Sequence, residues 1–291
     1  MEFNKDIKSK IKIFKNTNQR KSQRQITLTI MTVAIFFIAY IFISYWRISE
    51  ADLKVNFSEK FLGPSLEHLF GTDAVGRDMF LRTVKGLGIS ICVGMVASFS
   101  SVLITMTFAI LLTVFGKKTD IIVNWLIDIS LAIPHMVFLI VIAVAVGRGV
   151  KGIIIGIALT HWTSLTRIIR AEILEIKQEN YIKISQAMGK SSLYIAFNHV
   201  IPKILPQILV GTILLFPHAI LHEAGITFLG FGFDASTPAV GIILSEAMKY
   251  LIYGYWHLAI FPGIALVSIV VCINFLGESL KDLICPYSYH R

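Results

Sequence analysis

The chain has 291 residues, of which 55% are hydrophobic and only 15% are charged, and its mean hydropathy is +0.72. Soluble domains carry about 25% charged residues, so this composition excludes an ordinary soluble protein and indicates an all-α polytopic membrane protein. The net charge of +9 is then expected to be sorted across the bilayer rather than to bind nucleic acid, because no soluble segment is long enough to form a basic face.

Apolar runs predict six transmembrane helices. The first, at 26–46, follows a basic tail at 1–25 and is long enough, at about 1.5 Å per residue, to cross about 30 Å of hydrocarbon. A loop at 47–86 leads into a transmembrane core at 87–280, and a tail follows at 281–291. The core is expected to hold five further spans, at 87–115, 121–146, 152–167, 208–229 and 258–276. Pro134 should kink the span at 121–146.

Six spans place both termini on one side of the cell membrane, and the positive-inside rule selects that side. With a cytoplasmic N-terminus, the inner segments hold 18 Lys and Arg residues and the outer segments hold nine. Both tails and the polar segment 181–206 are therefore predicted to be cytoplasmic, and the loop at 47–86 is predicted to be extracellular.

The segment 181–206 is the longest polar, positively charged interruption in the otherwise apolar second half of the chain. Its Lys, Ser, Gln, Asn and His side chains would be costly in lipid, so it should face water. Tyr181, Ile184 and Met188 are spaced three and four apart, which predicts an apolar docking face on a short helix. We therefore expect this segment to bind a soluble partner.

Three residues with restricted backbones are expected to shape the same segment. Gly189 would allow a tight change of direction. Pro202 and Pro206 would restart the chain at a fixed angle into the span at 208–229. Such a rigid helix can pass the motion of a partner to the membrane helices.

The first loop contains the sequence GTDAVGRD, in which Gly71, Thr72, Asp73, Gly76, Arg77 and Asp78 stand out. Thr72 or Asp73 is expected to cap a helix by accepting backbone N–H bonds. Asp73 and Arg77 are four residues apart and should form an ion pair. From its residues alone the motif is a surface cap with a weak salt bridge, without a catalytic role.

The fifth span carries ionisable side chains at membrane depth: His218, His222 and Glu223. Such groups usually face a cavity and are candidates for a translocation path. His218 and His222 share a helix face, and imidazoles suit nickel, cobalt, zinc and copper. Either they line the path of a metal chelate or polar peptide-like solute, or they are hydrogen-bonded packing residues. Asp128 and His135 in the third span are weaker candidates.

Several colinear motifs resemble the second permease subunit of the dipeptide, oligopeptide and nickel importers of the ATP-binding-cassette (ABC) class. They are GTDAVGRDMFLR from Gly71, DISLAIP from Asp128, YIKISQAMG from Tyr181 with HVIPKILP from His199, EAGITFLGFG from Glu223 and NFLGESLKD from Asn274. The resemblance covers about 69–286 and implies a type I ABC importer permease fold. It also implies that 181–206 docks on an ATPase. The family's docking loop begins Glu-Ala-Ala where this chain has Lys183, Ile184 and Ser185, so either the charge pattern suits a particular ATPase or Lys183 is simply exposed to solvent.

The resemblance implies a non-enzymatic subunit that binds no cofactor itself, because ATP and magnesium would bind to partner subunits. The implied partners are a second homologous permease, two ATP-binding subunits, an extracellular solute-binding protein and membrane lipid. Two classes of cargo stay open. The histidine pair favours a metal or metal chelate, including an opine-type metallophore complex, whereas short peptides are the family's commonest cargo. An intramembrane enzyme and a passive channel are remote alternatives.

Overall fold

The computed structural model describes residues 28–284. The predicted tail at 1–25 and most of the tail at 281–291 lie outside this range. The described residues form helices joined by loops, the longest at 48–78, and contain no β-strand. Five helices have membrane length: Leu28–Arg47, α2 (Met79–Phe115), α5 (Val150–Ile176), α8 (Ile201–Phe228) and α10 (His257–Ile284). The shorter helices are α3 (Lys117–Ala132), α4 (His135–Val146), α6 (Asn180–Ala187), α7 (Ser192–Ile195) and α9 (Val240–Leu251).

Helices α3 and α4 together are apolar enough to form a sixth span, although they are bent by 98° at the break between them. The all-α, six-span prediction is therefore confirmed if this bent pair counts as one span. A single kinked helix over 121–146 is wrong, however. Pro134 lacks a backbone N–H and holds Ile133 in an extended conformation, with φ −89° and ψ 133°, so the helix ends there and restarts at His135.

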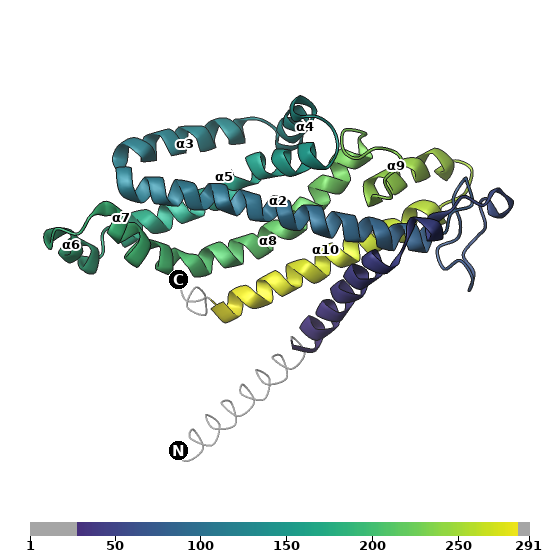
Figure 1. The fold of residues 1–291 in the computed structure, drawn as a ribbon, viewed down its shortest axis with the longest axis horizontal. Coiled ribbons are helices and arrows are strands. Elements are labelled where there is room, and N and C mark those ends of the chain that lie inside the picture. Colours follow the sequence, from purple (N-terminus) through teal and green to yellow (C-terminus); the bar gives the residue numbers. More distant parts are fainter. Residues whose placement is uncertain (1–27, 285–291) are drawn as a thin grey trace, which may run out of the picture.

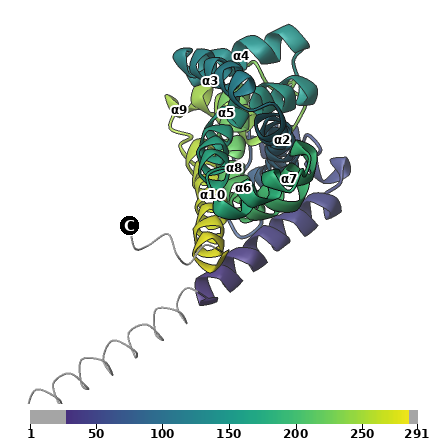
Figure 2. The same ribbon diagram turned by 90° about the vertical axis from the view of Figure 1, so that its left-hand side faces the viewer.

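The long helices α2, α5, α8 and α10 run along the long axis of the molecule (Figure 1). Helices α6 and α7 lie at one end of this bundle, whereas α9 and the loop at 48–78 lie at the other. Seen from the end that carries α6 and α7, the helix Leu28–Arg47 lies at the edge of the bundle (Figure 2). The polar segment 181–206 and the loop that contains the GTDAVGRD motif thus lie at opposite ends of the helix bundle.

Apolar side chains between the long helices form the core. One buried cluster joins α2, α5 and α8 near α6 and α7, and another joins Leu28–Arg47, α2, α8 and α10. Close packing of α4 on α5 requires Gly152, since a Cβ there would lie 2.2 Å from the carbonyl oxygen of Gly147. Gly156, where a Cβ would lie 3.3 Å from the carbonyl oxygen of Leu139, lies on the same face, so this small-residue pair lets the two helices approach closely.

Several helices extend beyond their predicted limits, and α2 and α5 show why. Helix α2 begins at Met79 rather than at 87, because the Asp78 side chain caps it. Helix α5 continues to Ile176 rather than ending at 167, because Ile169, Ile173 and Ile176 are fully buried in the core. Capping and tertiary burial outweigh the polar residues that limited the sequence-based assignment.

Candidate functional site

A cavity of about 440 Å³ opens between α4, α5, α8 and the end of α10. Its wall is largely apolar, with contributions from Leu165, Ile168 and Leu214, and it also includes Gln207 and Lys281. The remaining polar lining is dominated by four imidazoles, which belong to His135, His161, His218 and His222. An apolar cavity with a few convergent polar groups is the usual form of a small-solute site.

Three of these imidazoles form a compact cluster. The ring centres are 4.7 Å apart for His135 and His161, 4.5 Å for His135 and His222, and 4.9 Å for His161 and His222. Each ring offers a nitrogen, and these three nitrogens lie within 4.8 Å of one another. We call His135, His161 and His222 the histidine cluster. His218 lies one helical turn before His222 on the same wall.

Three separate helices deliver the cluster. His135 is the first residue of α4, directly after the 98° bend between α3 and α4. His161 lies within α5 and is 6% exposed, and His222 lies within α8. The bend that ends α3 is thus what brings His135 to the other two rings.

The predicted path residues divide into two groups. His218 and His222 line the cavity, as the sequence predicts. Glu223 does not line it, because its fully buried carboxylate accepts hydrogen bonds from Ser90 of α2 and from Thr227. Asp128 is exposed on α3, where one carboxylate oxygen lies 3.8 Å from a guanidinium nitrogen of Arg167, and it also lies outside the cavity lining.

The polar end of the bundle carries α6, which presents an apolar face to solvent. Tyr181, Ile184 and Met188 are 40%, 60% and 71% exposed. Lys183 is exposed beside them, whereas Ser185 is buried and its Oγ lies 3.4 Å from His199 Nε2. The predicted apolar face therefore exists, and Ser185 belongs to the inner side of α6.

Gly189 ends α6 with φ +75°, in the left-handed region that favours glycine. A Cβ at this position would meet no atom within 4 Å, so the requirement is one of backbone conformation alone. The predicted turn at Gly189 is confirmed.

Pro202 and Pro206 do not redirect the chain, and that prediction is wrong. The helical path continues without a break from Ser192 to Phe228. A π-helical turn at Ala196–Val200 lets the Ile201 N–H bond to the Ala196 carbonyl, and Pro202 follows directly after this turn, at the start of α8. The segment before Pro202 is therefore rigidly continuous with α8.

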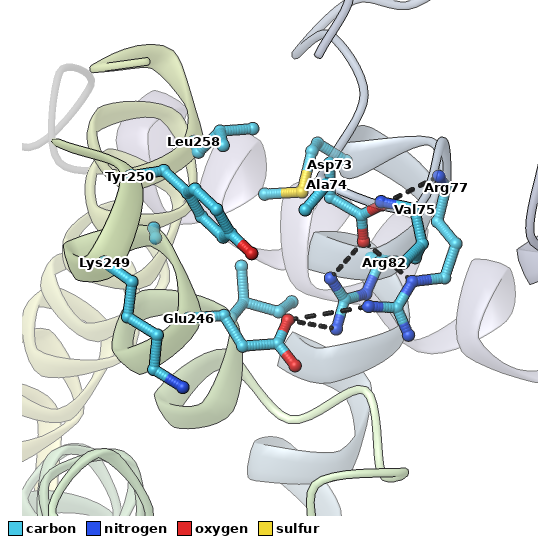
Figure 3. Close-up of a pocket in the computed structure, with 12 residues that line it drawn as sticks. Asp73, Ala74, Val75, Arg77, Arg82, Glu246, Lys249, Tyr250 and Leu258 are labelled. Atoms are coloured by element: carbon cyan, nitrogen blue, oxygen red, sulfur yellow. Dashed lines mark hydrogen bonds and ion pairs between the residues drawn. The ribbon is translucent and has the colours of Figure 1, made fainter. Parts of the chain in front are cut away.

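At the other end of the bundle, Asp73 is the centre of an ion-pair network (Figure 3). Its Oδ2 accepts hydrogen bonds from Arg77 Nε at 2.7 Å and from Arg82 Nη1 at 2.6 Å. Arg82 Nη2 also donates to Glu246 Oε2 of α9 at 3.0 Å. The predicted pair of Asp73 and Arg77 is confirmed, and the fully buried Arg82 extends it to α9.

The sequence predicts that Thr72 or Asp73 caps the following helix, but neither residue does. Asp78 caps α2 by accepting the Leu81 N–H at 2.9 Å. Asp73 Oδ1 instead accepts two backbone N–H bonds within its own turn, and the Thr72 hydroxyl bonds to two backbone groups of the preceding segment. A turn at Gly76 separates these residues from the helix start.

Gly71 and Gly76 both have positive φ, +73° and +77°. A Cβ at Gly76 would lie 1.7 Å from the carbonyl oxygen of Asn56, and one at Gly71 would lie 2.4 Å from that of Leu62. Both positions therefore require glycine for conformation and for space.

Residues 101–286 match the family described as "Binding-protein-dependent transport system inner membrane component". The chain is 32% identical to the dipeptide transport system permease protein DppC of Alkalihalophilus pseudofirmus, over 82% of this chain and 78% of that protein. It is 34% identical to the oligopeptide transport system permease protein OppC of Bacillus subtilis, over 77% of this chain and 73% of that protein.

A solved structure of the MetNI methionine ABC transporter in an inward-facing conformation contains a chain with the same fold. The TM-score is 0.56 at 20% sequence identity, and the match covers 71% of this chain and 97% of the other. The six-span helical fold is thus that of an ABC importer permease. The matches over most of the sequence show that this chain belongs to the binding-protein-dependent transport system inner membrane component family, as a permease subunit of an ABC importer.

Proposed function

We propose that this permease subunit imports short peptides or peptide-like solutes across the cytoplasmic membrane. The observation that carries the proposal is its similarity, over about three quarters of the sequence, to permeases named for dipeptide and oligopeptide transport. The cavity with its apolar wall, Gln207 and Lys281 fits this class, because a short peptide offers apolar side chains, a carboxylate and amides.

The subunit would work beside a second homologous permease, two ATP-binding subunits and an extracellular solute-binding protein. In this arrangement the α6 end is cytoplasmic and the loop at 48–78 faces outward, which agrees with the excess of Lys and Arg on the α6 side. Tyr181, Ile184 and Met188 would bind in a cleft of an ATPase. Since the helical path is unbroken from Ser192 to Phe228, a displacement at this end would reach the cavity wall in α8 as a rigid-body motion.

A second candidate cargo is a transition metal in a chelate. The histidine cluster in the cavity favours it, because imidazole nitrogens are good ligands for divalent nickel, cobalt, copper and zinc. The two candidates share the same path and the same ATP-driven cycle, and they differ only in what the imidazoles bind.

Uptake into proteoliposomes that contain the complete transporter tests the proposal. Peptide-loaded binding protein is supplied on the outer side, and ATP is supplied on the side of the ATPases. We expect accumulation of labelled di- to pentapeptides that requires both ATP and the binding protein. Peptide flux that continues without ATP, or an ATP-driven transporter that accumulates none of these peptides, would contradict it.

The variant Ile184→Asp tests the role of α6 in the same assay. A charge buried in an apolar contact without a partner costs at least about 1–3 kcal/mol, so uptake should fall about tenfold or more while the helices stay folded. Gln186→Asp is the matched control, because Gln186 is exposed on the same helix but lies away from the apolar face, and its uptake should match the wild type.

A further inference from the structure

We propose that His135, His161 and His222 form a coordination site for a divalent transition-metal ion that passes through the cavity bound to an anionic amino-carboxylate chelator. This inference rests on the proposed role of the cavity as the translocation path. It goes further by naming the atoms that would bind the metal and the chemistry of the complex that carries it.

The three rings converge in the cavity. Their nitrogens lie within 4.8 Å of one another although they come from three helices that are separate in the sequence. Metal–nitrogen bonds of about 2.0–2.1 Å place two ligating nitrogens about 3 Å apart. Imidazole rotations that move each nitrogen by about an ångström would therefore complete the site, without any displacement of the helices.

Hydrogen bonding fixes which nitrogen of two of these rings carries the proton. His161 Nδ1 lies 3.1 Å from the carbonyl oxygen of Ile157, which can only accept, so Nδ1 is the donor and Nε2 keeps its lone pair. His222 Nδ1 lies 3.0 Å from Met136 Sδ, a weak acceptor, so Nδ1 is the donor here too and Nε2 of His222 keeps its lone pair. Hydrogen bonding of the second ring nitrogen is the usual support of a metal-binding histidine.

The third ring of the cluster carries an unpaired polar atom. Among the residues that the structure describes, His135 Nε2 is buried and has no hydrogen-bond partner. A buried nitrogen without a partner is costly, and most such groups in proteins are paired. A metal ion held between the three rings, whose ligand nitrogens lie within 4.8 Å of one another, would satisfy it.

Charge indicates the kind of complex. The cluster contains no carboxylate, since Glu223 is turned towards Ser90 of α2 and binds there. Three neutral imidazoles leave both positive charges of a divalent ion uncompensated in a largely apolar wall, which is unfavourable. An anionic chelator that travels with the metal would supply the missing charge. Lys281 on the same cavity wall would then attract its carboxylates.

A defined probe is nickel iminodiacetate, in which a tridentate amino-dicarboxylate leaves three positions of an octahedral nickel ion open. The complete transporter, purified without a histidine tag and held in nanodiscs, is titrated calorimetrically. We expect saturable binding at one site per chain. Nickel bound to EDTA, which leaves no position for three imidazoles, should not bind.

Single substitutions identify the ligands. Loss of even an outer hydrogen-bond partner lowers metal affinity about 10–100-fold, so His161→Ala or His222→Ala should weaken binding by at least about 100-fold. Met136→Leu removes only the partner of His222 Nδ1 and should weaken it about tenfold. His218→Ala is the matched control in the same cavity, outside the cluster, and should change the affinity by much less than the cluster variants.

Assembly and basal ATPase activity of each variant show that it is folded, and His161→Gln and His222→Gln replace any alanine variant that fails to assemble. Binding of equal strength in the wild type and the cluster variants, or no binding to the wild type, would overturn the site. ATP-driven peptide uptake without nickel binding would leave the proposed function standing and reject the site. Nickel binding without ATP-driven uptake of any solute would reject the function and keep the site.

Discussion

Replacement of Asp73 is the most informative perturbation of the fold, because one carboxylate serves two guanidinium groups and a turn. Asp73→Ala removes the partner of Arg82, which is 2% exposed and retains only Glu246. Breaking a buried ion pair from one side costs about 3–5 kcal/mol. The remaining contact of Arg82 with Glu246 keeps the expected loss at the lower end of that range, about 3 kcal/mol.

Asp73→Asn separates the contribution of the Asp73 charge from that of its hydrogen bonds within the turn. The amide oxygen can still accept the two backbone N–H bonds, both at 2.9 Å, that Asp73 Oδ1 accepts. Only the charge towards Arg77 and Arg82 is lost, so this variant should be destabilised by about 2 kcal/mol, less than the alanine variant. Asp234→Ala removes an exposed carboxylate elsewhere and should change stability by no more than about 0.5 kcal/mol.

Thermal unfolding of the purified transporter measures these differences. At about 2–4 °C per kcal/mol, Asp73→Ala should lower Tm by about 6–12 °C, and Asp73→Asn should lie between it and the wild type. The double variant Asp73→Ala with Arg82→Met should recover part of the loss, because no buried charge is then left with a reduced set of partners. Equal Tm values for Asp73→Ala and Asp234→Ala would refute the assignment of a structural role to the network.

Three further substitutions follow from backbone and packing geometry. Gly76→Ala should destabilise the loop by at least about 2 kcal/mol, because its Cβ would overlap a carbonyl oxygen, whereas Gly63→Ala meets no atom within 4 Å and should be neutral in the same Tm measurement. Gly189→Ala should reduce ATP-driven uptake more than Gly189→Asn, because Asn tolerates the left-handed conformation; equal uptake would show that the turn is not needed. Glu223→Leu should cost about 1–3 kcal/mol by leaving the buried Ser90 hydroxyl unpaired, with Glu223→Gln close to the wild type, and neither should alter nickel binding; a loss of binding in either would mean that Glu223 acts in the cavity.

Local patterns in the sequence predicted much of this fold. Hydrophobic length gave the spans, the polar segment gave the exposed face around Ile184, and spacing gave the pair of Asp73 and Arg77. Each of these depends on residues that are close in the sequence. The same is true of Gly189, whose positive φ follows from a single residue type.

Long-range contacts were beyond such patterns. Arg82 and Glu246 are 164 residues apart, and nothing in either segment indicates the other. The histidine cluster likewise required the 98° bend between α3 and α4, which the sequence indicated only as a kink at Pro134. His161 was not predicted as a site residue, because a lone histidine in an apolar span has no recognisable spacing. The continuity of the helix through Pro202 depends on a π-helical turn that local residue propensities do not predict.

Labelling of single cysteines from either side of the membrane tests the central claim, that the two ends of the bundle face opposite compartments and α6 faces the ATPases. In a chain whose three native cysteines are replaced, Leu66→Cys and Gln186→Cys offer thiols at exposed positions of the two ends, and Gln186 lies away from the apolar face that would bind the ATPase. We predict that an impermeant maleimide labels Leu66→Cys in intact cells and labels Gln186→Cys only after the membrane is opened. Labelling of Gln186→Cys in intact cells would contradict this orientation.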